Sequence, residues 1–162
     1  NSNIATIDNV IINDVSTNNT VMVMASGEGD YEYALDDASG PYQDDTTFYN
    51  VSPGYHTVYV RDKNGCGIAN KAISVIGFPK FLTPNNDGYN DTWHVYGINT
   101  SSQSKSEIYI FDRYGKLLKQ LLYNSPGWDG TYNGYQMPTS DYWFYIKLGD
   151  NRIFKGHFTL KR

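Results

Sequence analysis

Oxygen-bearing side chains gather in residues 85–91, which read Asn-Asn-Asp-Gly-Tyr-Asn-Asp. Oxygens at alternate positions beside a glycine suit a hard cation, since Ca²⁺ binds roughly six to eight of them. The ligands would be Asn85, Asp87 and Asp91, with the backbone carbonyl of Tyr89. The segment is shorter than the calcium loop of an EF-hand, and no glutamate closes it. The same side chains also suit turns in which they accept backbone N–H groups, so both interpretations stay open.

The acidic pairs Asp36-Asp37 and Asp44-Asp45 raise the question of glycoside hydrolysis, which uses two carboxyl groups across a cleft. Adjacent residues of a strand face opposite ways, so solvated acids in turns explain the pairs better, with Ca²⁺ that rigidifies inter-strand loops as an alternative. The three histidines show no metal-ligand spacing, and no nucleophile motif or phosphate loop is present. We therefore expect no catalytic activity.

Three tryptophans, Trp93, Trp128 and Trp143, lie in the second half of the chain. Exposed aromatic rings can stack on sugars, which would make this a carbohydrate-binding surface. Buried, the same rings would fill the core of a small β-domain, where aromatic burial dominates the energetics. The sequence favours the core.

Two groups of polar residues are candidates for docking a partner protein. Asp112, Arg113, Tyr114, Gly115 and Lys116 place both charges at the tip of an expected hairpin. Charged residues at such a tip can form the turn and keep the edge of the sheet from pairing with another chain. Alternatively, they can be recognised by a partner protein. The second group is basic and comprises Lys155, Lys161 and Arg162.

The elements that must position these residues are strands. Tyr, Phe, Val, Ile and Thr are abundant, and Asn-Gly and Asp-Gly pairs mark tight turns between short alternating segments. No stretch shows helical periodicity. Strands are expected at 4–12, 20–25, 31–35, 55–62, 71–76, 92–96, 106–112, 117–122, 141–148 and 152–160, with 42–49 partly extended. Because the last strand alternates up to residue 160, we expect the final residues to be held in a sheet.

Charge divides the chain near Gly77. Residues 1–77 hold ten acidic and three basic side chains, a net charge of −7. Residues 78–162 hold seven acidic and ten basic side chains, a net charge of +3. We therefore predict an all-β fold of two small antiparallel β-sandwich domains of immunoglobulin-like type in tandem, 1–77 and 78–162. The weak positive charge argues against nucleic-acid binding.

Three further expectations follow from the whole sequence. The chain starts at Asn1, so we expect it to be part of a longer protein whose leader lies upstream. No apolar run approaches the roughly 20 residues needed to cross a bilayer. Cys66 is the only cysteine, which excludes a disulfide within the chain, and we expect it to be buried as a small apolar residue.

Five spaced blocks run through residues 81–162: 81–93, 108–116, 127–130 with Pro138, 141–143 and 155–162. In content and order they resemble the gliding-motility-associated C-terminal domain, the type B sorting domain of the type IX secretion system of Bacteroidota. The resemblance departs from the family at Asn86, where glycine is commoner, and at 139–140, where Ser-Gly is commoner. Residues 28–76 resemble one immunoglobulin-like repeat of large bacterial adhesins.

The resemblance implies a function that composition does not reveal. Domains of this family direct an attached protein from the periplasm through the type IX translocon to the cell surface or the medium. Type B domains are associated with an outer-membrane partner of the PorP/SprF class, and their cargo includes large adhesins of gliding cells such as SprB. No metal or other cofactor is implied. The alternative function is a carbohydrate-binding β-sandwich module of a secreted protein.

Overall fold

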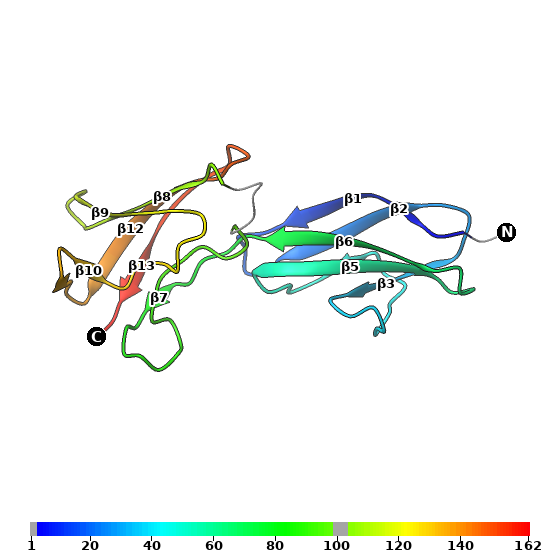
Figure 1. Ribbon diagram of the computed structural model, residues 1–162, viewed down its shortest axis with the longest axis horizontal. Helices are drawn as coiled ribbons and strands as arrows, with labels where there is room; N and C mark the ends of the chain where they lie inside the picture. The colour runs from blue at the N-terminus through cyan, green and yellow to red at the C-terminus, as the bar shows by residue number, and fades with distance from the viewer. Residues whose placement is uncertain (1–2, 99–103) are drawn as a thin grey trace. The chain divides into compact units, whose positions relative to one another are not determined.

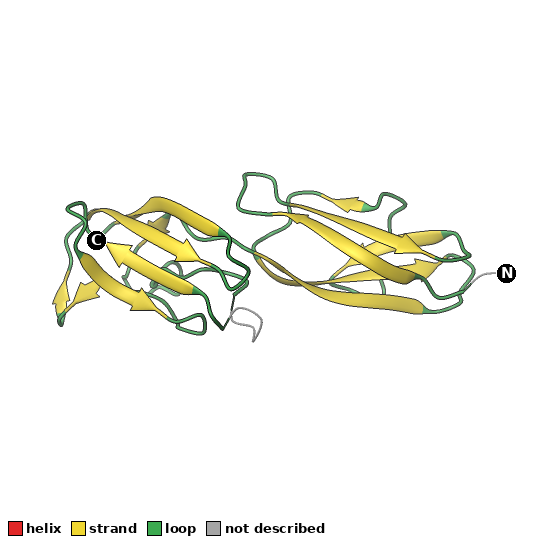
Figure 2. Cartoon of the chain, turned by 90° about the horizontal axis from the view of Figure 1, so that it is seen from above, coloured by secondary structure: helices red, strands yellow, loops and turns green. Residues whose placement is uncertain are grey.

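The computed structural model describes residues 3–98 and 104–162, and its contacts divide the chain into two compact units, Asn1–Gly77 and Phe78–Arg162. Strands joined by turns make up both units, and no helix occurs in the described residues (Figure 2). The predicted all-β fold class is therefore confirmed. Over this same part of the chain, a helix of sufficient length and apolarity to cross a membrane is not found.

The first unit consists of two three-stranded sheets with strand orders β1-β2-β4 and β3-β5-β6 (Figure 1). All pairings in both sheets are antiparallel. Strand β5 alternates as expected, and Val58 and Val60 enter a core that Val21 and Val23 of the other sheet complete. The strands are β1 (Thr6–Asn13), β2 (Thr20–Ser26), β3 (Tyr31–Leu35), β4 (Thr47–Phe48), β5 (Gly54–Asp62) and β6 (Ile68–Val75).

The second unit is built on a five-stranded sheet of order β7-β13-β12-β8-β9, with a separate small hairpin, β10-β11 (Figure 1). Strand β13 pairs antiparallel with β12 over eight residue pairs and parallel with β7 on its other side. The strands are β7 (Phe81–Leu82), β8 (Glu107–Phe111), β9 (Leu117–Leu121), β10 (Thr131–Tyr132), β11 (Tyr135–Gln136), β12 (Ser140–Lys147) and β13 (Ile153–Leu160).

Aromatic rings fill the core of the second unit. Tyr142 and Phe144 of β12 face inward, as the alternation predicts, and Phe158 of β13 joins them. The ring of Trp93 stacks on Phe158 at 4.7 Å between centroids, and Trp128 meets Tyr142 edge-on at 5.2 Å. Stacked and edge-on ring pairs each stabilise the fold by roughly 0.5–1.5 kcal/mol more than the burial of their surface area does.

Three local predictions were wrong. Residues 92–96 form no strand, because Trp93 makes only an isolated bridge with Trp128. Trp143 is not a core residue: it lies on the opposite face of β12 from Tyr142 and is 40% exposed. Cys66 is exposed rather than buried, because it follows the tight turn that ends β5.

Candidate docking site

The hairpin tip between β8 and β9 is fixed by one carboxylate. Asp112 Oδ1 accepts the backbone N–H groups of Tyr114 and Lys116, both at 2.9 Å. The backbone of Asp112 also bonds to Lys116 and to Gly115, whose φ of 81° favours a residue without a side chain. Tyr114 is left 79% exposed at this tip. The predicted hairpin is therefore an ordered projection from the sheet.

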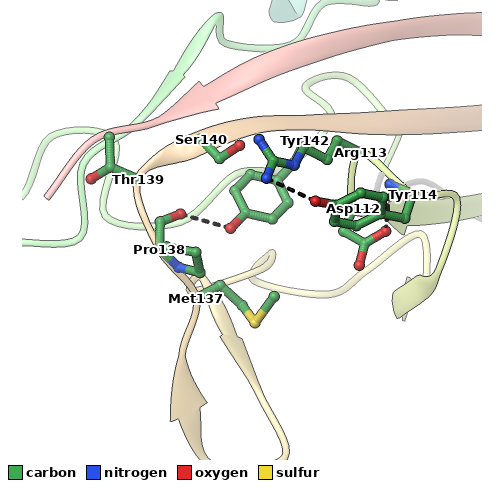
Figure 3. A pocket seen from close by; sticks show the side chains of 8 residues that line it. All are labelled: Asp112, Arg113, Tyr114, Met137, Pro138, Thr139, Ser140 and Tyr142. Atoms are coloured by element: carbon green, nitrogen blue, oxygen red, sulfur yellow. Dashed lines mark hydrogen bonds between the residues drawn. The ribbon is translucent and has the colours of Figure 1, made fainter.

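A cavity of about 290 Å³ lies between this tip and residues 137–140, which lead into β12 (Figure 3). Tyr142 lines it, and its hydroxyl donates a 2.7 Å hydrogen bond to the carbonyl of Pro138. Burial raises the pKa of Tyr142, so the hydroxyl keeps its proton at neutral pH. The lining residues are Asp112, Arg113, Tyr114, Met137, Pro138, Thr139, Ser140 and Tyr142.

Arg113 supplies the positive charge of this cavity. One guanidinium nitrogen donates to the Tyr114 hydroxyl at 2.8 Å, and the guanidinium lies 5.0 Å from the centre of that ring. Figure 3 shows this hydrogen bond beside the lining residues. Asp112 also lines the cavity and adds a negative charge there, although no ion pair joins it to Arg113 in the described part of the chain; its Oδ1 accepts the backbone N–H groups of the tip.

Arg162 approaches the same segment from β13. Its backbone N–H donates to Thr139 Oγ1 at 3.0 Å, and its guanidinium donates to the carbonyls of Met137 at 2.6 Å and Gly130 at 2.8 Å. The structure thus brings the hairpin tip and one member of the basic group to a single segment, residues 137–140.

The other basic candidates lie elsewhere on the second unit. Lys161 holds its ammonium 4.6 Å from the centre of the Phe81 ring, and its backbone N–H donates to Leu82. Lys155 lies 5.5 Å over the Tyr145 ring on the outer face of the sheet. Lys116 lies 4.6 Å over the ring of Tyr132. The predicted basic group of Lys155, Lys161 and Arg162 is therefore not one cluster.

Residues 85–91 form a loop tied together by its own carboxylates. Asp91 accepts the N–H of Asn86 on Oδ1 at 2.8 Å and that of Gly88 on Oδ2 at 2.7 Å. Asn85 and Asp87 accept the N–H two residues ahead, at 3.3 and 2.9 Å. Asn86 adopts the left-handed conformation, with a φ of 63°, that asparagine tolerates. Backbone amides thus use the oxygens proposed for Ca²⁺, an arrangement that favours the turn.

In the first unit, Asp36, His56 and Ser52 line a cavity of about 510 Å³. Asp36 Oδ2 lies 2.6 Å from His56 Nδ1, but His56 Nε2 lies nearer the carbonyl oxygen of Ser52, at 2.7 Å, than its hydroxyl, at 3.4 Å. A carbonyl oxygen only accepts, so Nε2 carries a hydrogen and is not placed to take the proton of Ser52. The arrangement ties a loop to β5 and does not form a catalytic triad.

The outer face of the five-stranded sheet carries a row of aromatic side chains around Trp143, which was expected in the core. Trp143 pairs across the sheet with Phe111 on β8 and with His157 on β13, whose ring lies 6.0 Å away. Tyr109 and Tyr145 form the next row, with ring centroids 6.2 Å apart. The alternation of Trp143 with inward-facing Tyr142 and Phe144 was the signal that could have identified this face.

Comparison with known protein families gives a match that lies almost entirely in the second unit. Residues 76–160, just over half of the chain, match the model of the family described as CHU_C type IX secretion signal domain. No curated protein matches the chain.

Several solved structures share low similarity with the chain. One is a biofilm-associated protein, BSP domain, with 14% identity and a TM-score of 0.33 over 94% of this chain and 29% of that one. Sidekick-1 immunoglobulin domains 1–4 give 10% identity and a TM-score of 0.30 over 97% and 48%. A Bacteroides ovatus SGBP-B in complex with a mixed-linkage heptasaccharide gives 13% and 0.24 over 99% and 42%. The chain spans less than half the length of each.

A type IX secretion signal is a non-catalytic module that the secretion machinery handles, and it implies secretion to the cell surface. The match covers the compact unit except its last two residues, and so includes the hairpin tip, the residues that line the cavity and all of β13. Through residues 76–160, the chain belongs to the CHU_C type IX secretion signal domain family.

Proposed function

We propose that residues 78–162 act as a type B sorting domain that carries a large adhesin of a gliding cell through the type IX translocon. Residues 1–77 are the adjoining immunoglobulin-like repeat of that adhesin. The observation that carries the proposal is the family match at residues 76–160, which begins and ends close to the bounds of the compact unit Phe78–Arg162. The secretion machinery then recognises a folded surface rather than a linear peptide.

The docking surface of this proposal is the end of the second unit around the β8–β9 hairpin. Asp112, Arg113, Tyr114, Gly115 and Lys116 present an ordered, exposed tip, and Arg162 braces the segment beside it. Lys155 and Lys161 are secondary contacts on the outer face and near β7. The partners are the translocon and an outer-membrane protein of the PorP/SprF class.

The cargo side of the proposal rests on the first unit. Its two small antiparallel sheets enclose a single valine-rich core, an architecture that repeats well in extended surface proteins. Its charge of −7 keeps such a unit soluble outside the cell.

The test is export of a foreign protein that carries a signal peptide and residues 78–162 at its C-terminus. Surface or medium appearance in a host with a working type IX system, and periplasmic retention in a host without it, is the expected result. A matched fusion with Leu160→Asp disrupts the core and should be retained in both hosts. Retention of the intact fusion in the competent host would contradict the proposal.

Carbohydrate binding is a second candidate because Trp143 is exposed within a row of aromatic side chains. Rings on an open face can stack on sugar rings. A soluble glycan should then quench or shift tryptophan fluorescence in the wild-type chain but not in Trp143→Ala, since Trp93 and Trp128 are buried. Equal responses of the two chains, or none, would remove this candidate.

A further inference from the structure

The guanidinium of Arg113 makes few contacts within the second unit. An arginine offers five N–H donors, and the structure gives those of Arg113 one acceptor, the Tyr114 hydroxyl at 2.8 Å. Within residues 3–98 and 104–162, Arg113 forms no ion pair, whereas Arg152 pairs with Asp150 at 3.0 Å. Arg113 is therefore available to a carboxylate from outside the chain.

The cavity beside Arg113 has the size and lining for a side chain rather than for a cofactor. Its volume is about 290 Å³, at or below the lower end of small-molecule pockets, which begin at roughly 300 Å³. Met137, Pro138 and Tyr142 give it an apolar side, and Thr139 and Ser140 complete the lining. Figure 3 shows Arg113 and Ser140 above the ring of Tyr142.

The walls of the cavity are held in place before any ligand arrives. On one side, Asp112 fixes the backbone of the tip. On the other, Arg162 binds the Met137 carbonyl and Thr139, and Tyr142 binds the Pro138 carbonyl. A preorganised site loses less entropy on binding, so a small contact area can still confer specificity.

Charge selects the occupant. Among the described residues that line the cavity, Arg113 is the cation and Asp112 is the anion, and Asp112 Oδ1 already accepts two backbone N–H groups. Residues 78–162 carry a net charge of +3. Arginine binds carboxylates through two parallel hydrogen bonds, a geometry that lysine does not reproduce. The cavity thus has an arginine beside an apolar wall. A peptide with an acidic residue next to an apolar residue would fit both.

We propose that this cavity receives an aspartate or glutamate side chain, flanked by an apolar residue, from an exposed segment of the outer-membrane partner. The inference rests on the proposed function and deepens it, since it names the chemistry by which the secretion partner recognises the folded signal. The carboxylate binds the guanidinium of Arg113, and the apolar neighbour packs against Met137, Pro138 and Tyr142.

The direct test is a titration of the ¹⁵N-labelled full chain with the capped peptide acetyl-Leu-Glu-Leu-amide. Amide signals of Tyr114, Thr139 and Ser140 should shift, and the glutamine version of the peptide should bind at least tenfold more weakly. Arg113→Gln should weaken binding about tenfold, Arg113→Lys should recover part of it, and Arg152→Gln should change nothing. No shift at these residues, equal binding of the two peptides, or stronger binding of inorganic phosphate would overturn the proposal.

Export separates this inference from the proposed function. The fusion described above is compared with its Arg113→Gln and Arg152→Gln versions in the competent host. At least a tenfold loss for Arg113→Gln alone supports the cavity. Normal export of both versions would overturn the cavity while the signal function stands. Failure of the unaltered fusion would instead reject the signal function.

Discussion

His94 shows how one half-buried side chain makes stability depend on pH. Its Nδ1 is buried without a hydrogen-bond partner in the part of the chain that the structure describes. Burial disfavours the charged imidazolium and lowers the pKa of His94 from its ordinary value of 6.5. The folded state therefore binds this proton at a lower pH than the unfolded state does.

We expect the free energy of unfolding to decrease as pH falls from about 6.5 through the lower pKa of folded His94, because the unfolded chain binds the proton first. Above that range His94 contributes no pH dependence. Urea unfolding at several pH values, followed by tryptophan fluorescence, measures the effect. His94→Phe should flatten the profile. An unaltered slope in His94→Phe would assign the pH dependence to another group.

The carboxylate of Asp91 holds together the loop of residues 85–91, and its removal should destabilise that loop without changing the rest of the fold. Asp91→Ala removes the acceptor of two backbone N–H groups, at Asn86 and Gly88, and should cost about 1–2 kcal/mol of stability. Asp87→Ala removes one acceptor and should cost less. Thermal unfolding with excess Ca²⁺ or a chelator checks the metal interpretation. We expect equal melting temperatures; a Ca²⁺-dependent rise that Asp91→Ala abolishes would show a cation site instead.

Among the elements, β13 depends on a residue without a side chain. Gly156 lies directly across from Phe144 on β12, and a Cβ at Gly156 would lie 2.8 Å from Phe144 Cζ. The ring of Phe144 occupies that space and also lies 4.6 Å from Phe78 and 5.1 Å from Trp93. The glycine thus lets the inner aromatic layer lie close to the sheet.

Gly156→Val should destabilise the second unit by about 1–3 kcal/mol, because the added methyl groups displace the Phe144 ring. Chemical denaturation followed by tryptophan fluorescence gives the value. Lys155→Val, on the exposed face of the same strand, is the matched control and should have little effect on stability. Equal effects of the two substitutions would mean that strand propensity, not the ring contact, determines stability here.

The sequence predicted those elements whose pattern is local. Strand β3 has the predicted bounds, and β12 buries Tyr142, Phe144 and Ile146 as its alternation requires, which Leu148 continues just past the strand. The two-residue strands β7, β10 and β11 were missed, since pairing with another segment, not periodicity, defines them. The cavity was missed for the same reason: the hairpin tip was identified, but residues 137–140 join it only through the sheet.

At the scale of the whole chain, the two units can be observed separately. Trp93, Trp128 and Trp143 all belong to the unit Phe78–Arg162, so tryptophan fluorescence reports that unit only. The first unit has a separate core, in which Val60 is fully buried.

Val60→Ala should lower the stability of the first unit by about 2 kcal/mol through a cavity in its core. Far-ultraviolet circular dichroism should then show an earlier transition, while the tryptophan transition keeps its midpoint. Leu82→Ala, in the second unit, is the reciprocal variant and should shift the tryptophan signal alone. A joint shift of both signals in either variant would indicate that the units unfold together.

The parallel pairing of β7 with β13 joins residues 81–82 to residues 159–160, the two ends of the second unit. Contacts between such distant parts of a chain form late in folding, because a long loop must close first. A unit that lacks either end leaves an edge of its sheet without a partner, and open edges promote aggregation. Because of this strand order, the sheet of the secretion signal can be completed only after the chain has been translated through β13.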